Sequence, residues 1–98
     1  MTTQSITSWV TGHHIYKRQW TPEIGDLLEC RREATNRYDR WAVAVYRCER
    51  IVGHVPRDLS RQFTAHLTAG RKISAQVIGK RENKRRRGLE VPVIYTIS

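Results

Sequence analysis

The stretch WAVAVYRCERIVGHV, residues 41–55, decides the fold because it contains two short strands and a tight connection between them. Over 41–48, apolar and β-branched side chains alternate between two faces, which is typical of a half-buried strand. Residues 49–50 form the connection, and 51–55 form the second strand. We therefore predict an antiparallel hairpin, although the favoured Asn-Gly turn is absent.

Further strands are expected on both sides of this hairpin, over residues 6–16, 26–32, 71–80 and 89–98. In the third of these, Ile73, Ala75 and Val77 alternate with polar residues, as in a strand with one buried face. In the last, Pro92 lacks a backbone N–H, which places the first part of the strand at an edge or a bulge.

Residues 56–70 have the features of a helix. Apolar side chains recur every four residues, at Leu59, Phe63 and Leu67. Asp58 is a candidate cap at the start, and Gly70 is a stop signal at the end. Three or four strands, one helix and two more strands predict a mainly β fold, a small OB-like β-barrel of about six strands with one or two helices. An open α+β sheet is the alternative.

The charge balance points to an anionic partner. Lys and Arg total 18 against nine Asp and Glu, so the 98-residue chain has a formal net charge of +9. Nucleic acid, a membrane surface or a polyacid would suit such an excess, and plain solubility is the alternative. No apolar run approaches the ~20 residues that span a bilayer. The first residues lack the features of a signal peptide, so we expect an intracellular protein, nuclear or cytoplasmic.

We expect one domain over residues 1–98, with a core at about 8–80, a basic loop at 80–88 and a closing strand at 89–98. Cys30 and Cys48 are too few for a disulfide framework, and both are expected in strands as free thiols.

The basic loop contains six cations and one carboxylate, at Lys80, Arg81, Glu82, Lys84, Arg85, Arg86 and Arg87. Like charges this close repel one another, so a bound anion would help to order them. Arg85 and Arg86 are candidate phosphate contacts. A solvated hairpin tip or a basic localisation signal is the alternative.

The segment TNRYDR, residues 35–40, offers a different chemistry. The ring of Tyr38 is suited to base stacking, and Asp39 is suited to accept a hydrogen bond from a hydroxyl group. From these residues alone we favour a structured turn in which Asp39 caps the backbone and Tyr38 packs on the barrel.

Catalysis and metal binding have no support in the sequence. His13 and His14 are adjacent, so on a strand they would point to opposite faces, and no cysteine or carboxylate completes a metal site near them or near His54 and His66. No nucleophile elbow, zinc-protease helix or phosphate-binding glycine loop is present. We expect a protein that is not an enzyme and needs no cofactor.

Three segments closely resemble the HIRAN domain: VTGHHIY (10–16), GDLLECRREATNRYDRWAVAV (25–45) and VGHVPRDL (52–59). The most specific part is R-x-x-x-N-x-Y-D-x-x-A-V-x-V followed by V-G-H-V. HIRAN domains occur in SWI/SNF-type DNA repair ATPases and as bacterial and phage modules. The resemblance implies an OB-like barrel that binds single-stranded DNA and recognises a free 3′-OH end, next to other domains or subunits of a helicase or ATPase.

The resemblance also assigns roles to individual residues. Asp39 would accept a hydrogen bond from the 3′-hydroxyl, Tyr38 and Tyr16 would hold the terminal base or sugar, and Asn36 would support the pocket. The phosphate contacts would come from His54 and Arg57, and His14 falls where the family's binding loop supplies a basic residue.

Two departures from the family pattern alter this interpretation. Ile15 precedes Tyr16 where the repair proteins have two adjacent tyrosines, and Thr35 replaces an asparagine. Both changes weaken base contacts, whereas the basic loop adds phosphate contacts. The sequence thus predicts a single-stranded DNA-binding module with a 3′-end pocket. The alternative is a protein-interaction or targeting module with an incidental basic surface.

Overall fold

The computed structural model describes residues 3–84 and 88–98, and in this part of the chain it contains seven strands, a 3₁₀ turn and one α-helix. The strands are β1 (Gln4–Val10), β2 (Leu27–Arg32), β3 (Val43–Arg47), β4 (Arg50–His54), β5 (Ile73–Val77), β6 (Glu82–Lys84) and β7 (Gly88–Ile97). The 3₁₀ turn η1 spans His13–Ile15 and the helix α1 spans Arg57–Thr68. The predicted mainly β fold is confirmed.

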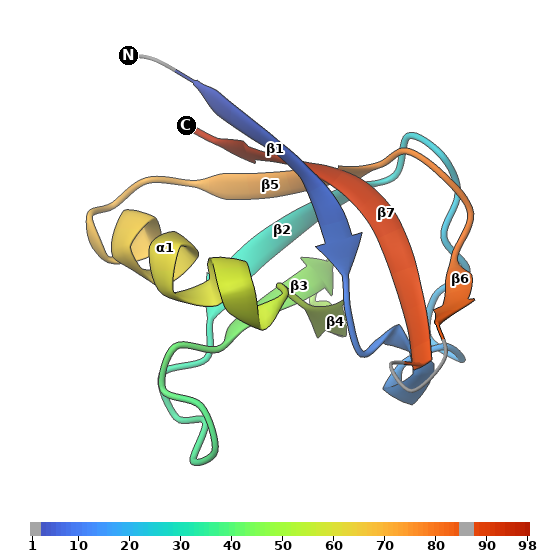
Figure 1. Cartoon of the computed structure of the whole chain (residues 1–98), viewed down its shortest axis with the longest axis horizontal. Coiled ribbons are helices and arrows are strands. Elements are labelled where there is room, and N and C mark those ends of the chain that lie inside the picture. Colours follow the sequence, from blue (N-terminus) through green and yellow to red (C-terminus); the bar gives the residue numbers. More distant parts are fainter. Residues whose placement is uncertain (1–2, 85–87) are drawn as a thin grey trace.

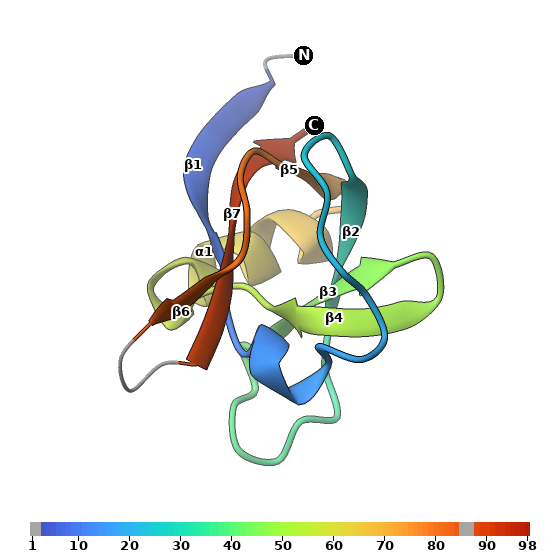
Figure 2. The ribbon, with the colours of Figure 1, turned by 90° about the vertical axis from the view of Figure 1, so that its right-hand side faces the viewer.

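The strands form one curled antiparallel sheet in the order β1-β7-β5-β2-β3-β4, and β6 pairs with β7 outside this path. Its two outer strands meet through an isolated bridge between Thr11 and His54. Their backbones exchange hydrogen bonds of 2.8 and 2.9 Å. The sheet therefore curls into a half-barrel, and α1 lies beside it (Figure 1). The same view shows the β2–β3 connection extending away from the sheet, as does the view at 90° in Figure 2.

The core forms where the alternating faces of the strands meet. Val43 and Val45 of β3 are fully buried, and Phe63 of α1 packs edge-on against Tyr95 of β7 at a ring-centroid distance of 5.1 Å. The Tyr95 hydroxyl donates a 2.7 Å hydrogen bond to the Trp9 carbonyl, so this large polar side chain is buried without an unsatisfied group.

The helix follows its predicted apolar pattern, but its cap differs. Pro56 occupies the N-cap position and no side chain caps it, so the prediction of an Asp58 cap is wrong. The physical reason is local, because the ring of Pro56 fixes its φ at a value suited to helix entry. At the other end Gly70 adopts φ +86°, and its N–H bonds the Leu67 carbonyl while Arg71 bonds that of His66. This is a Schellman motif, as the glycine predicted.

The first strand is shorter than expected. The sequence predicts a strand over 6–16, whereas β1 ends at Val10 and the chain turns at Gly12 with φ +69°. The 3₁₀ turn buries His13, whose Nδ1–H donates to the Val52 carbonyl at 3.1 Å. This long-range bond explains why a β-branched and aromatic segment leaves the sheet.

Two smaller expectations also need correction. The β3–β4 turn consists of Cys48 and Glu49 rather than residues 49–50, and Cys48 lies in this turn with φ +55° instead of in a strand. Pro92 does not lie on an edge strand, because β7 is flanked by β1 and β5. The pairing of β7 with β5 ends at Val93 and its pairing with β6 ends at Glu90, so Pro92 lies where the neighbouring strand is interrupted, which tolerates its missing N–H.

Candidate nucleic-acid interface

A cavity of about 270 Å³ lies between the β2–β3 loop, β4 and the start of α1. Five of the predicted site residues line it together: Asn36, Tyr38, Asp39, His54 and Arg57. Thr11, at the closure of the barrel, also lines it. Residues that the sequence places in three separate segments therefore share one pocket.

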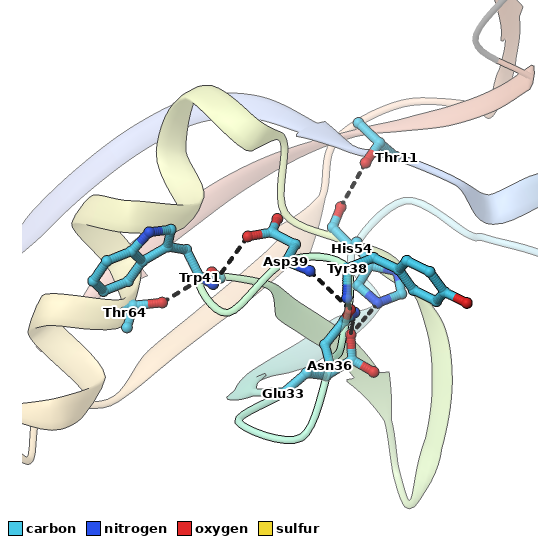
Figure 3. Close-up of polar contacts among 8 residues, drawn as sticks. All are labelled: Thr11, Glu33, Asn36, Tyr38, Asp39, Trp41, His54 and Thr64. Atoms are coloured by element: carbon cyan, nitrogen blue, oxygen red, sulfur yellow. Dashed lines mark hydrogen bonds and ion pairs between the residues drawn. The ribbon is translucent and has the colours of Figure 1, made fainter.

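The loop that forms one wall is shaped by two side chains (Figure 3). The Asn36 Oδ1 accepts hydrogen bonds from the backbone N–H groups of Tyr38 and Asp39, at 2.9 and 3.0 Å. Asp39 Oδ1 then accepts from the N–H of Trp41 at 2.9 Å. These are two consecutive Asx turns, the conformation that Asn and Asp favour.

The turn settles the prediction made for this segment from its residues alone. Asp39 does cap the backbone, as expected. Tyr38 does not pack on the barrel, because its ring is 93% exposed and points away from the loop (Figure 3). A large aromatic side chain held in solvent by a rigid turn is available for stacking.

Glu33 is a member of the site that the sequence did not reveal. Its Oε1 accepts a 2.5 Å hydrogen bond from His54 Nε2 and a longer one, 3.4 Å, from the Asn36 amide. The carboxylate therefore joins the loop to β4 and fixes the orientation of the imidazole. The available signal was an acidic residue between Arg32 and Asn36 within the matched motif.

Tyr16 lies beside this group. Its ring centroid is 6.3 Å from that of His54, with a 42° angle between the planes. Burial raises the pKa of the Tyr16 hydroxyl, and the nearby charge of Glu33 adds to the effect. The phenol is thus a neutral hydrogen-bonding group at the side of the pocket.

Of the other predicted residues, His14 does not line the pocket. The exposed His14 places its imidazole against Gly88 of β7, where a Cβ would collide with the ring. Arg85 and Arg86 lie outside the described residues. Their roles stay predictions.

A second hollow of about 270 Å³ adjoins the first and shares Tyr38, Asp39 and Arg57 with it. Its wall includes Trp41, whose ring centroid lies 4.8 Å from the guanidinium carbon of Arg40 and 5.0 Å from that of Arg61. The Trp41 carbonyl accepts a 3.0 Å bond from Thr64 of α1. The indole thus holds two cations beside the pocket. The sequence did not reveal this role, because Trp41 stands in an apolar strand pattern.

The pocket is lined by one carboxylate, that of Asp39, and one guanidinium group, that of Arg57. No described residue bonds the second carboxylate oxygen of Asp39, which leaves it available to a ligand donor. Arg57 lines both hollows and can bond a phosphate with a planar pair of donors. These two groups are chemically suited to a hydroxyl group next to a phosphate. Within residues 3–84 and 88–98 no three His, Cys, Asp or Glu side chains are grouped as metal ligands.

Comparison with protein families shows which family the chain belongs to. The model of the HIRAN domain matches residues 3–95. The chain belongs to the HIRAN family. HIRAN domains are DNA-binding modules, so the chain belongs to a family of DNA-binding domains. No curated protein sequence matches the chain at a significant level.

Two solved structures share the fold. The HIRAN domain of human HLTF superposes with a TM-score of 0.77 at 19% identity, and the match covers 95% of this chain and 74% of that one. A protein from Lactobacillus plantarum superposes with a TM-score of 0.65 at 16% identity, over 99% of this chain and all of that one. Among the described residues of this HIRAN domain, no helix is long and apolar enough to cross a membrane.

Proposed function

We propose that this HIRAN domain binds single-stranded DNA and holds the 3′-OH end of the strand in the pocket formed by the β2–β3 loop, β4 and α1. The observation that best supports this is the position of Asp39. One of its oxygens is used by the Asx turn, and no described residue bonds the other, which faces a pocket lined by Arg57. A carboxylate accepts a hydrogen bond from a hydroxyl and repels a phosphate.

The size of the pocket favours a strand end over a duplex. A volume of about 270 Å³ is below the usual range for drug-sized ligands, roughly 300–1,000 Å³. It suits one sugar or one base and has no room for a base pair. The exposed Tyr38 ring at its mouth suits a base that is no longer stacked in a helix.

Phosphates of the same strand would follow the cations. Arg57 lines the pocket, and Arg40 and Arg61 add two cations beside it, each against the ring of Trp41. The overall charge of +9 adds long-range attraction. In a larger assembly, such a module would present a strand end to helicase or ATPase domains in DNA repair or at replication forks.

The test compares one oligonucleotide with a 3′-OH and the same oligonucleotide with a 3′-phosphate. The wild-type domain is expected to bind the 3′-OH form about tenfold more tightly, the value of one charge-assisted hydrogen bond. Asp39→Asn keeps an oxygen for the Trp41 N–H but removes the charge, so the two forms should bind alike. Glu23→Gln removes the same charge from an exposed loop residue and should leave the preference intact.

Equal wild-type affinity for the two ends would contradict end recognition, whatever the affinity itself. No binding to any single strand at low salt would instead favour a protein-interaction module.

A further inference from the structure

The largest of the cavities described here has no role in the proposed end recognition. It has a volume of about 580 Å³ and lies at the end of β1, beside the start of α1. It adjoins the end-binding pocket, because Thr11 and Arg57 line both. Trp9 and Glu90 complete its walls on the side of β1 and β7.

Glu90 is the unusual residue of this cavity. It is only 3% exposed, on a strand segment that pairs with β6. No described residue forms a hydrogen bond or ion pair with its carboxylate. Every buried side-chain oxygen or nitrogen of the described residues that is closed to solvent has a partner. The small exposed area of Glu90 therefore belongs to its carboxylate, which opens into the cavity it lines.

A buried carboxylate without a donor is costly, and it selects its ligand by charge. It would repel a phosphate, and the nearby Asp58, which also lines the cavity, adds to that repulsion. It would accept hydrogen bonds from an amino group, as carboxylates do from the N4 amine of cytosine.

We infer that this cavity binds a nucleobase with an exocyclic amino group, next to the strand end held by Asp39, and that Glu90 accepts a hydrogen bond from that amine. The inference rests on the proposed function, because the shared Arg57 would contact the phosphate between the two nucleotides. Cytosine and adenine satisfy the carboxylate, whereas thymine and uracil present a carbonyl oxygen that it repels. A basic peptide would also suit Glu90, but the continuity with the DNA pocket favours a base.

The test uses the whole chain and a short oligo-dC with a 3′-OH, in which cytosines are replaced by uracil one position at a time. This change exchanges an amine for a carbonyl. The wild-type domain should lose about tenfold in affinity at one position close to the 3′ end. In Glu90→Gln the amide can donate as well as accept, so the loss at that position should nearly disappear. Glu23→Gln should behave as wild type.

Each outcome separates the two proposals. A uniform response to uracil at all positions, or a position-specific loss that persists in Glu90→Gln, would overturn the inference while the 3′-OH preference stands. The uracil scan on the wild-type protein remains decisive if Glu90→Gln does not fold. If no oligonucleotide binds and a lysine-rich peptide shifts the Trp9 indole N–H resonance, the cavity belongs to a protein partner and both proposals fail.

Discussion

At one end of β3, residues 33–42 form a long connection to β2, and at the other end Cys48 and Glu49 form a two-residue turn to β4. The long connection is held by side-chain bonds to its own backbone and lines the proposed DNA pocket. The short turn carries an exposed ion pair between Glu49 and Arg31. The same strand thus has one end shaped for binding and one that only reverses the chain.

The two connections of β3 differ in which groups form hydrogen bonds with their backbone N–H groups. In the long connection, Asn36 and Asp39 bond backbone N–H groups that no strand partner reaches. Next to the short turn, sheet pairing continues to Arg47 and Arg50. The backbone groups there are therefore bonded by the opposite strand and need no side-chain acceptor. Substitutions at the first end should therefore change DNA binding, whereas those at the second should not.

The largest effect is expected for Asn36→Ala. It removes the acceptor of two backbone N–H groups and should cost about 1–3 kcal/mol of stability. The loop would lose its shape, so affinity for a 3′-OH strand should fall at least tenfold. Titration and thermal unfolding measure the two effects. An Asn36→Asp variant keeps an acceptor and should retain the fold, and equal losses in both variants would contradict the turn argument.

Arg57→Ala should come next. This residue lines all three cavities around the site, and its loss should weaken binding to every sequence alike, by roughly tenfold at low salt. The slope of log affinity against log salt should become shallower by about 0.7, the value of one phosphate on a single strand. Arg50→Ala, which removes a cation next to the short turn, serves as the control. Identical slopes for both variants would argue against a phosphate contact at Arg57.

A moderate effect is expected from pH, through a residue outside both connections. Burial lowers the pKa of His13 from 6.5, since the folded protein resists charging this ring. Below pH 6.5 the unfolded chain takes up a proton that the folded chain does not, so stability should fall until the lowered pKa is reached. His13→Gln should flatten the dependence of the unfolding free energy on pH between about 7 and 5. If the dependence of the unfolding free energy on pH is unchanged in His13→Gln, His13 is not its source. His66→Gln is the control and should leave this dependence unchanged.

The smallest effect is expected for Glu49→Ala. Its ion pair with Arg31 is exposed, and such pairs contribute little in water. The midpoint of thermal unfolding should barely move and DNA affinity should not change. A loss of DNA affinity as large as that of Arg57→Ala would mean that the short turn also belongs to the binding surface.

The sequence was sufficient to predict an element where the local apolar pattern coincides with burial in the structure. The alternation of Val43 and Val45 and the repeat around Phe63 place β3 and α1 in the core. The motif brought Asn36, Asp39 and Arg57 to attention, and the structure places them in one pocket.

The remainder depends on contacts between distant segments. The bond from His54 to Glu33 spans 21 positions, and nothing local distinguishes this glutamate. The end of β1 depends on the contact of His13 with Val52, 39 positions away. Glu90 lies in a strand pattern that gives no sign of a cavity beside it. Periodicity describes which face is buried, but it does not identify the partner across that face.

The bridge between Thr11 and His54 gives the domain a mechanical property. These two residues close the half-barrel, and both also line the proposed DNA pocket. When this bridge opens, the barrel and the pocket are therefore disrupted together. A bound strand end should make this opening less frequent. Hydrogen exchange at the amides of Thr11 and His54, which donate the two closing bonds, should therefore slow when a strand end occupies the pocket.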